Sequence, residues 1–367
     1  MFYHFLYPLK EFFSAFNIFQ YITFRSAGAA ITSMILSFFI GPMVINKLKM
    51  MQIGELIRID GPKSHLSKKG TPTMGGIIIV FSTLFPVLLW ADLTNIYIQI
   101  MLFSTLWMSG IGFIDDYLKV IKKYKKGLIA KYKMAGQISL GLIMGAIIFL
   151  HPHFKEINTL ISIPFLRNVE LDLGLFYIPF VIFVVTGTSN AVNLTDGLDG
   201  LAAGLMGIAI MAMAMVSYMS GRVDFSQYLH TLYLPGAGEL TIYCLAAVGG
   251  LLGFLWYNSH PAQVFMGDTG SLGMGGALGT LAILLRKEIL FALLGGVFVA
   301  EALSVMIQVG YFRYTKKKYG EGRRIFRMAP LHHHYEMKGT KETKIVIRFW
   351  IIGILLALLS LSSFKIL

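Results

Sequence analysis

The chain has 367 residues, of which 56% are hydrophobic and only 14% carry a charged side chain. Its mean hydropathy is +0.67, whereas soluble globular domains are about 45–50% apolar and about 25% charged. These values exclude a soluble domain and predict an integral membrane protein, which we expect to be all-α and to form a single domain over residues 1–367. The net charge of +13 fits basic residues beside membrane spans better than nucleic-acid binding, and it would attract anionic lipids and phosphorylated substrates.

Apolar runs in chain order predict about ten transmembrane helices, since a spanning helix needs about 20 mainly apolar residues. An aromatic, roughly amphipathic segment over 1–21 precedes them and is expected to lie in the membrane interface. Residues 313–344 form a large polar loop before the last span. The predicted spans are 23–46, 73–90, 95–114, 133–150, 174–188, 199–219, 240–257, 270–285, 288–312 and 345–364.

Basic residues between the spans predict the orientation. Most lysines and arginines fall in the connections that lead from an odd to an even span. The opposite connections hold only Lys155, Arg167, Arg222, Arg286 and Lys287. Because cytoplasmic loops carry the excess of basic residues, we expect both termini outside and the odd-to-even connections in the cytoplasm.

Five aspartates stand in three short polar islands between the apolar runs. Asp115 and Asp116 lie in GFIDDYLK, Asp196 and Asp199 in NLTDGLDG, and Asp268 in FMGDTG. Acidic residues at membrane depth are energetically expensive and usually functional. All three islands fall in odd-to-even connections, so we expect a carboxylate cluster on the cytoplasmic face that suits Mg²⁺ or Mn²⁺. The simpler alternatives are a helix-end ion pair with Lys119 and helix-capping turns.

Two further motifs lie on the same predicted face. KKGTPTMGG places Lys68, Lys69 and Thr73 before a helix start, an arrangement that suits an anion. PLHHHYE contains His332, His333 and His334, which fit phosphate or sugar hydrogen bonding as well as metal binding; a solvated loop is the simpler alternative. Together the motifs favour transfer of a phosphorylated group from a soluble nucleotide donor to a lipid acceptor, with Mg²⁺ neutralising the diphosphate.

Four motifs carry a family resemblance: GxxDDxxK at 112–119, NLTDGLDGLA at 193–202, FMGDTGS at 265–271 and PLHHHYE at 330–336. The chain resembles the polyprenyl-phosphate N-acetylhexosamine-1-phosphate transferases and, with KGTPTMGG, the bacterial phospho-N-acetylmuramoyl-pentapeptide transferases in particular. The resemblance implies transfer of phospho-MurNAc-pentapeptide from its UDP carrier to undecaprenyl phosphate, giving lipid I and UMP. It also implies Mg²⁺, a homodimer, and a multi-pass protein of the bacterial inner membrane that acts in peptidoglycan synthesis.

The resemblance further implies roles for individual residues. Asp268 would hold the metal, and Asp115 and Asp116 would act at the lipid phosphate, with Lys119 and His332 as further catalytic residues. Phe265 would stack on the uracil. The expected substrate-binding residues are Lys68, Thr73, Lys131, Asn190, Asn193, Asp196, Asp199, Asn258, Phe265, Gln308, His333 and His334.

Three alternatives remain open at this stage. A sister enzyme that uses UDP-GlcNAc would share the aspartates, although the histidine and threonine-glycine motifs favour the muramoyl-pentapeptide donor. A nucleotide-sugar transporter is the remote alternative, because the chain shows no convincing internal repeat and its polar motifs share one predicted face. The reaction itself could be direct attack by the lipid phosphate or could pass through a covalent phospho-aspartate.

Overall fold

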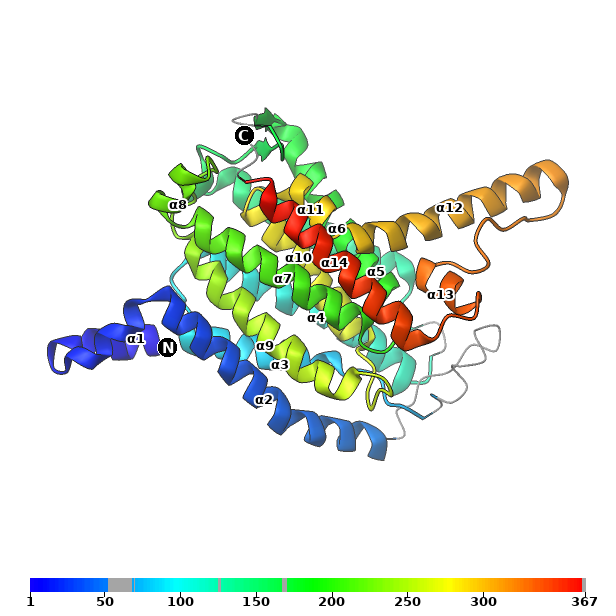
Figure 1. Cartoon of the computed structure of the whole chain (residues 1–367), viewed down its shortest axis with the longest axis horizontal. Helices are drawn as coiled ribbons and strands as arrows, with labels where there is room; N and C mark the ends of the chain where they lie inside the picture. Colours follow the sequence, from blue (N-terminus) through cyan, green and yellow to red (C-terminus); the bar gives the residue numbers. More distant parts are fainter. Residues whose placement is uncertain (52–67, 69, 125–126, 167–169, 365–367) are drawn as a thin grey trace.

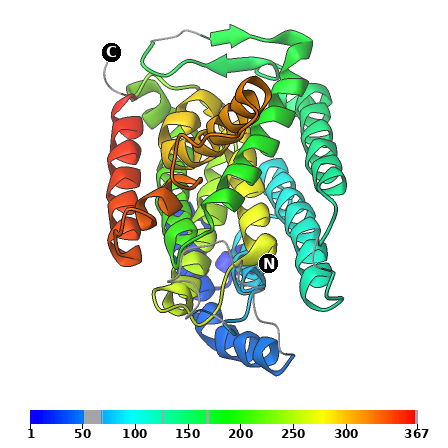
Figure 2. The same ribbon diagram turned by 90° about the vertical axis from the view of Figure 1, so that its right-hand side faces the viewer.

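The computed structural model describes residues 1–51, 68, 70–124, 127–166 and 170–364 as a bundle of long helices (Figure 1). Figure 2 shows the helices running side by side, with a small two-stranded hairpin at one end of the bundle. Some of the basic residues named or counted in the sequence prediction lie outside the described residues: Arg58, Lys63, Lys69, Lys125, Lys126 and Arg167.

A long helix lies at the position of each predicted span. These helices are α2 (Ile22–Met50), α3 (Gly76–Trp90), α4 (Ile96–Val120), α5 (Ala130–Leu150), α6 (Tyr177–Thr195), α7 (Leu201–Ser220), α9 (Leu240–Asn258), α10 (Gly267–Leu284), α12 (Gly296–Tyr319) and α14 (Glu342–Ser362). Eight of the described helices are long and apolar enough to cross a membrane; α3 is shorter, and α10 is not among them. The helical class and the multi-pass membrane character are confirmed, whereas the number of crossings and their orientation remain predictions.

Shorter elements connect the long helices and cover the N-terminus. They are α1 (Phe2–Leu6), η1 (Tyr7–Glu11), η2 (Ser14–Gln20), η4 (Pro152–Phe154), β1 (Leu160–Ser162), β2 (Glu170–Asp172), η5 (Gly174–Phe176), α8 (Val223–Tyr228), η6 (Ala237–Glu239), α11 (Glu288–Leu294) and α13 (Leu331–Glu336). The antiparallel hairpin β1–β2, in which Ile161 is opposite Leu171, was not predicted. The predicted single span 288–312 is in fact two helices, α11 and α12, which meet at Gly295.

Several helices continue past the boundaries that the sequence predicts. Helix α4 runs six residues beyond 114, to Val120, so Asp115 and Asp116 are helical, and α6 runs beyond 188 to Thr195, so the NLTDGLDG motif begins in a helix and continues as a turn. Helix α10 begins at Gly267 and carries Asp268 in its first turn. Helix α12 reaches Tyr319, so the predicted loop 313–344 begins inside a helix.

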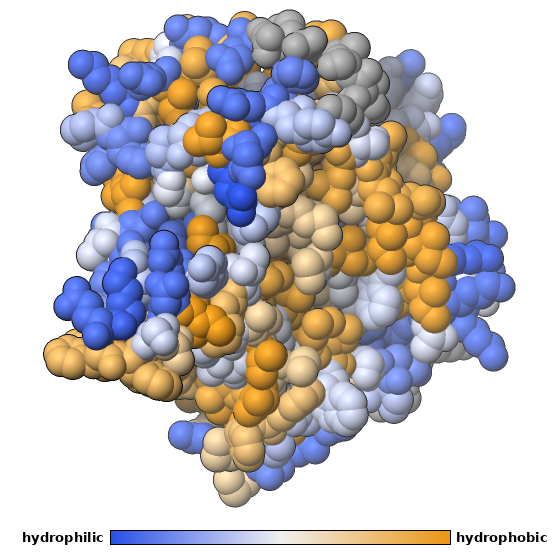
Figure 3. Space-filling view, turned by 60° about the vertical axis from the view of Figure 1, so that its left-hand side comes forward, coloured by the Kyte–Doolittle hydropathy of each residue, from blue (hydrophilic) through white to orange (hydrophobic). Residues whose placement is uncertain are grey.

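Helix α10 is the centre of the bundle, and every residue from Thr269 to Leu284 is buried. Helices α3 and α4 approach α10 closely because glycine residues stand at the points of contact. A Cβ atom added to Gly112 of α4 would lie 2.1 Å from the carbonyl oxygen of Asp268, and one added to Gly76 of α3 would lie 2.1 Å from the nitrogen of Gly270. A helix surrounded by protein needs no lipid-facing apolar surface. Large apolar side chains instead gather on the outer face of the bundle, as Figure 3 shows for one side.

Candidate active site

Three of the five aspartates meet where α4 ends and α10 begins. One carboxylate oxygen from each of Asp115, Asp116 and Asp268 lies within 4.8 Å of the other two. Asp115 and Asp116 are almost completely buried, and the Asp268 side chain is 14% exposed. Three carboxylate oxygens at this spacing form a set of hard ligands that suits Mg²⁺ or Mn²⁺.

Two lysines pair with the carboxylates of this cluster. The ammonium of Lys119, one turn after Asp115 on α4, lies 3.0 Å from Oδ2 of Asp268 and pairs with Asp115 as well. Lys133 of α5 lies 2.9 Å from Oδ2 of Asp115 and also pairs with Asp268. Asp115 accepts a further hydrogen bond of 2.6 Å from the backbone N–H of Leu128. The two ammonium groups balance most of the buried negative charge.

Asp116 holds the first turn of α10 in place. Its carboxylate accepts hydrogen bonds from the backbone N–H groups of Asp268 at 3.0 Å and Thr269 at 2.9 Å, and from the Thr269 hydroxyl at 2.6 Å. Unpaired N–H groups at a helix N-terminus favour an acidic side chain. The two adjacent aspartates therefore differ: Asp115 pairs with lysines, whereas Asp116 fixes the helix that carries Asp268.

The threonine-glycine motif and the FMGDTGS motif pair with each other along their backbones. The N–H of Phe265 donates to the carbonyl of Pro72, and the N–H of Gly75 donates to the carbonyl of Phe265, both at 2.8 Å. Thr73 lies beside Gly267, because a Cβ atom added there would be 3.0 Å from the Thr73 hydroxyl. The structure therefore brings Thr73 next to the acidic cluster.

Helix α6 contributes amide side chains to the same region. Asn193 donates from Nδ2 to Oδ1 of Asp268 and to the Ser271 hydroxyl, at 2.8 Å in each case. Asn190, nearly one turn earlier, donates at 2.9 Å to the side chain of Gln137. Asp196 follows the last residue of α6 and is partly exposed. Asn193 thus contacts the acidic cluster directly.

Asp199 belongs to a second charged cluster. Its carboxylate lies 2.7 Å from Nζ of Lys68 and 3.0 Å from Nδ1 of His260. Lys68 also pairs with Glu342 at 2.6 Å, and its ammonium lies 5.9 Å from the centroid of the Phe265 ring. Burial lowers the pKa of Lys68, but the hydrogen bonds to Asp199 and Glu342 outweigh burial and raise that pKa above its ordinary value. Lys68 is therefore a cation throughout the physiological pH range.

Two of the predicted binding residues use their amide groups within the fold. Asn258 is 3% exposed; its Oδ1 accepts from the N–H of Gly200 at 3.0 Å, and its Nδ2 donates to the carbonyl of Val264 at 2.9 Å. Gln308 of α12 accepts from the N–H of Phe326 at 3.0 Å. Asn258 fixes two segments next to the second cluster, Gln308 fixes the segment between α12 and α13, and the contacts of both with substrate remain predictions.

The three histidines of α13 lie in different surroundings. His332 is completely buried against Glu301 of α12, with 3.3 Å between His332 Nδ1 and the carboxylate, and its ring packs on Gly197, where an added Cβ would come within 2.2 Å of Nε2. His333 pairs with Glu336 at 2.7 Å. His334 accepts the backbone N–H of Arg327 through Nδ1 at 3.1 Å. Burial, with smaller effects from Lys338 and Arg327, lowers the pKa of His334 below its ordinary value, which keeps that nitrogen free to accept.

Sequence reasoning missed Lys133 and Glu342 of the two charged clusters, and Glu301 beside His332. It chose Lys131 as a phosphate contact, but Lys131 is exposed and forms no ion pair within the described parts of the chain, whereas Lys133 lies in the acidic cluster. A signal for Glu301 was available, because it is a lone acid inside a predicted span and acids at membrane depth are usually functional. The role of Lys131 remains a prediction.

Comparison with known proteins places the chain in a class. A sequence model of glycosyl transferase family 4 matches residues 98–286, which carry the Asp115–Asp116 pair, the NLTDGLDG motif and Asp268. The chain belongs to this family of membrane transferases.

Further similarity identifies the branch of that family. Residues 68–80 match the first signature of the phospho-N-acetylmuramoyl-pentapeptide-transferases. Over 365 residues the chain is 54% identical to the phospho-N-acetylmuramoyl-pentapeptide-transferase of Thermodesulfovibrio yellowstonii, covering 100% of this chain and 99% of the relative. It is 54% identical to that of Desulfosudis oleivorans, covering 100% of both chains, and 48% identical to that of Flavobacterium psychrophilum, covering 100% and 99%. The chain belongs to the phospho-N-acetylmuramoyl-pentapeptide-transferases.

Proposed function

We propose that the protein transfers phospho-MurNAc-pentapeptide from UDP-MurNAc-pentapeptide to undecaprenyl phosphate and thereby forms lipid I and UMP. The reaction takes place on the cytoplasmic face of the bacterial inner membrane, requires Mg²⁺, and is carried out by a homodimer. The observation that carries the proposal is the cluster of Asp115, Asp116 and Asp268, flanked by Lys119 and Lys133, in a chain that matches these transferases over its whole length.

The acidic cluster fits a magnesium ion. Each of Asp115, Asp116 and Asp268 offers one oxygen within the reach of a single ion, and Asp268 is the most exposed of the three carboxylates. Asp268 would therefore be the principal ligand, and Asp115 and Asp116 would supply the other two carboxylates of the site. Bound there, Mg²⁺ would neutralise the diphosphate and stabilise the UMP leaving group.

The lysines would position the two phosphates. Lys119 and Lys133 already bridge Asp115 and Asp268, so their ammonium groups stand where a phosphate oxygen can replace a carboxylate partner. The lipid phosphate needs little help from a base, because its second pKa of about 6 leaves it largely deprotonated at neutral pH. We therefore favour direct attack on the phosphorus next to the sugar, with Asp115 in contact with the lysines that orient the attacking oxygen.

The second charged cluster would bind the nucleotide. The ammonium of Lys68 lies over the Phe265 ring, 5.9 Å from its centroid, and is held by Asp199 and Glu342, so an aromatic ring and a fixed cation are neighbours. A uracil ring would stack on Phe265. The remaining predicted contacts, from Asn190, Asp196 and His333 among others, would surround the sugar and its phosphate.

The test is a two-donor assay with purified enzyme. With undecaprenyl phosphate as acceptor, UDP-MurNAc-pentapeptide should give UMP and a labelled lipid product, and UDP-GlcNAc should give neither. Product from UDP-GlcNAc alone would overturn the proposed donor, and flux of nucleotide sugar into sealed vesicles without UMP release would overturn the transferase reaction. Stable label on the protein after incubation with donor labelled in the transferred phosphate, in the absence of lipid, would exclude direct attack.

A further inference from the structure

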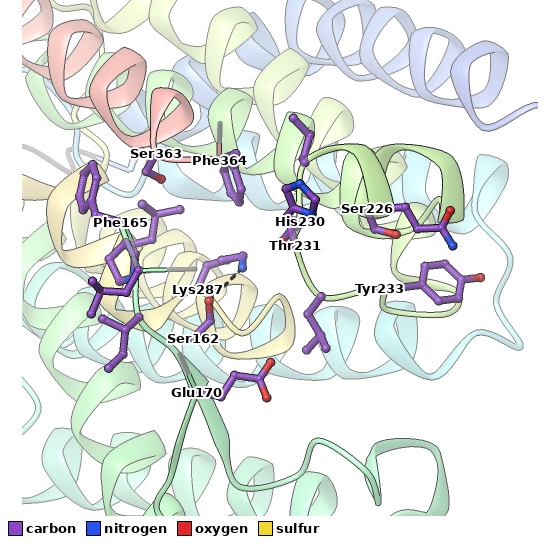
Figure 4. Close-up of a pocket in the computed structure, with 17 residues that line it drawn as sticks. Ser162, Phe165, Glu170, Ser226, His230, Thr231, Tyr233, Lys287, Ser363 and Phe364 are labelled. Atoms are coloured by element: carbon purple, nitrogen blue, oxygen red, sulfur yellow. Dashed lines mark hydrogen bonds between the residues drawn. The ribbon is translucent and has the colours of Figure 1, made fainter. Parts of the chain in front are cut away.

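A cavity of about 460 Å³ lies at the other end of the bundle from the acidic cluster. Helix α10 has 18 residues and is therefore about 27 Å long; it begins at the acidic cluster and ends just before Lys287, which lines the cavity. The hairpin β1–β2 and its turn, α8 with the segment after it, α11 and the residues after α14 form the rest of the wall (Figure 4). Small-molecule sites commonly have about 300–1,000 Å³, so the cavity is large enough for a ligand.

The floor of the cavity is a buried lysine. Lys287 is only 5% exposed, and its ammonium donates to the Ser162 hydroxyl at 3.3 Å and lies 5.4 Å from the centroid of the Phe364 ring. No carboxylate of the described residues lies within 4.0 Å of it. Glu288, its neighbour in sequence, instead accepts a hydrogen bond of 2.8 Å from the Tyr177 hydroxyl. Burial lowers the pKa of Lys287 to about 8, and the more distant charges of Glu288 and Glu170 offset this effect only in part, because burying a cation without a paired anion is costly.

Backbone strain is concentrated around the same cavity. Phe165 and His230 line it with φ values of 66° and 51°, and Arg286, which precedes Lys287, has a φ of 55°. Non-glycine residues rarely adopt positive φ, and such residues cluster at functional sites. Within the described residues only two further cases occur, Met74 and Lys123, and both lie in the segments that border the acidic cluster.

The wall of the cavity is partly open and mixes polar residues, among them the exposed Glu170, with an apolar stretch next to Lys287. Phe165 is 38% exposed and Leu166 is 55% exposed, and Leu232, Leu290 and Phe364 complete the apolar lining. Figure 4 shows Lys287 with Phe165 on one side, His230 and Thr231 on the other, Phe364 above it and Glu170 below it. A buried cation beside an apolar stretch of the wall matches a ligand that has one anionic group and a hydrocarbon chain.

We propose that this cavity binds an anionic amphiphile, whose carboxylate or phosphate pairs with Lys287 and whose hydrocarbon chain lies between Phe165 and Phe364. The bound anion supplies the ionic partner that Lys287 lacks among the described residues. The site is distinct from the acidic cluster and does not depend on the transferase reaction.

The test measures the melting temperature of the purified protein in a nonionic detergent with three probes: dodecyl phosphate, inorganic phosphate and dodecanol. Dodecyl phosphate should raise the melting temperature saturably, and the two other probes should do so only at concentrations at least about tenfold higher, since each lacks one of the two contacts. Equal binding of dodecanol would overturn the role of the charge. Equal binding of inorganic phosphate would reduce the site to a simple anion site.

Two variants and a control locate the binding. Lys287→Met should weaken dodecyl phosphate binding at least about tenfold, and Phe364→Ala, close to the chain end, should weaken it while leaving inorganic phosphate unaffected. Lys155→Met removes an exposed lysine of the neighbouring connection and should bind as wild type does. Unchanged binding in both Lys287→Met and Phe364→Ala would refute the proposal. Transferase activity of Lys287→Met should equal that of wild type.

Discussion

Replacing Lys133 by glutamine tests whether the cluster of lysines and carboxylates is the reaction centre. Lys133 lies 2.9 Å from Asp115, pairs with Asp268, and is only 22% exposed. The loss of one charge-assisted hydrogen bond at such a site costs about 1.5–3 kcal/mol. Because about 1.4 kcal/mol corresponds to a tenfold change in rate, kcat/KM for undecaprenyl phosphate should fall about 10- to 100-fold. UMP release with both substrates varied measures the change.

Lys122→Gln is the matched control for this substitution. It removes the same charge from the connection between α4 and α5, but Lys122 is exposed and has no ion pair within the described residues. Its kcat/KM should stay within about twofold of wild type, as for most exposed substitutions. Both variants should melt within a few degrees of wild type. A loss in Lys122→Gln as large as that in Lys133→Gln would refute the assignment of Lys133 to the site.

Three other substitutions test single elements of the site. Asp268→Asn should lower turnover more than about 100-fold while detergent stability stays near wild type; retained activity would refute its metal role. Glu301→Gln removes the buried carboxylate 3.3 Å from His332 and should lower kcat about tenfold, with exposed Glu321→Gln as the control. Gly112→Ala should destabilise the fold by about 1–3 kcal/mol, measured as a lower melting temperature, because its Cβ would clash with Asp268 of α10. Gly110→Ala should be neutral, since nothing lies within 4 Å of its Cβ; equal effects of the two would show that the α4–α10 contact is not tight.

The helices and their order could be predicted from hydropathy, but the functional ends of those helices could not. The predicted third span stops at 114, whereas α4 continues to Val120, because the polar residues after 114 find partners on α5 and α10. A hydropathy profile ends the apolar run at Asp115. In the fold, Lys119 and Lys133 pair with this carboxylate, and the helix continues past it. The same reasoning explains why the start of α10 was placed three residues too late.

The choice between Lys131 and Lys133 illustrates a second limit. Successive residues of an α-helix are rotated by about 100° around its axis, so two lysines two residues apart lie on nearly opposite sides of the helix. Which of them faces the carboxylates depends on how α5 packs, and sequence spacing alone does not contain that information. Glu301 was a different kind of omission, since a lone acid within an apolar run was visible in the sequence and only its partner, His332, had to come from the fold.

The net charge of the acidic cluster indicates that a further cation is needed when the nucleotide donor binds. Three carboxylates and two lysines leave one negative charge, which the N-terminus of α10 offsets by about half a charge. The donor diphosphate adds about two negative charges and the lipid phosphate nearly two more, so two lysines alone cannot balance them. We therefore expect Mg²⁺ to strengthen binding of the nucleotide donor to wild-type enzyme, measured by calorimetry without lipid, and to do so much less in Asp268→Asn. Donor binding that is equally strong with and without Mg²⁺ would show that the metal acts only after binding.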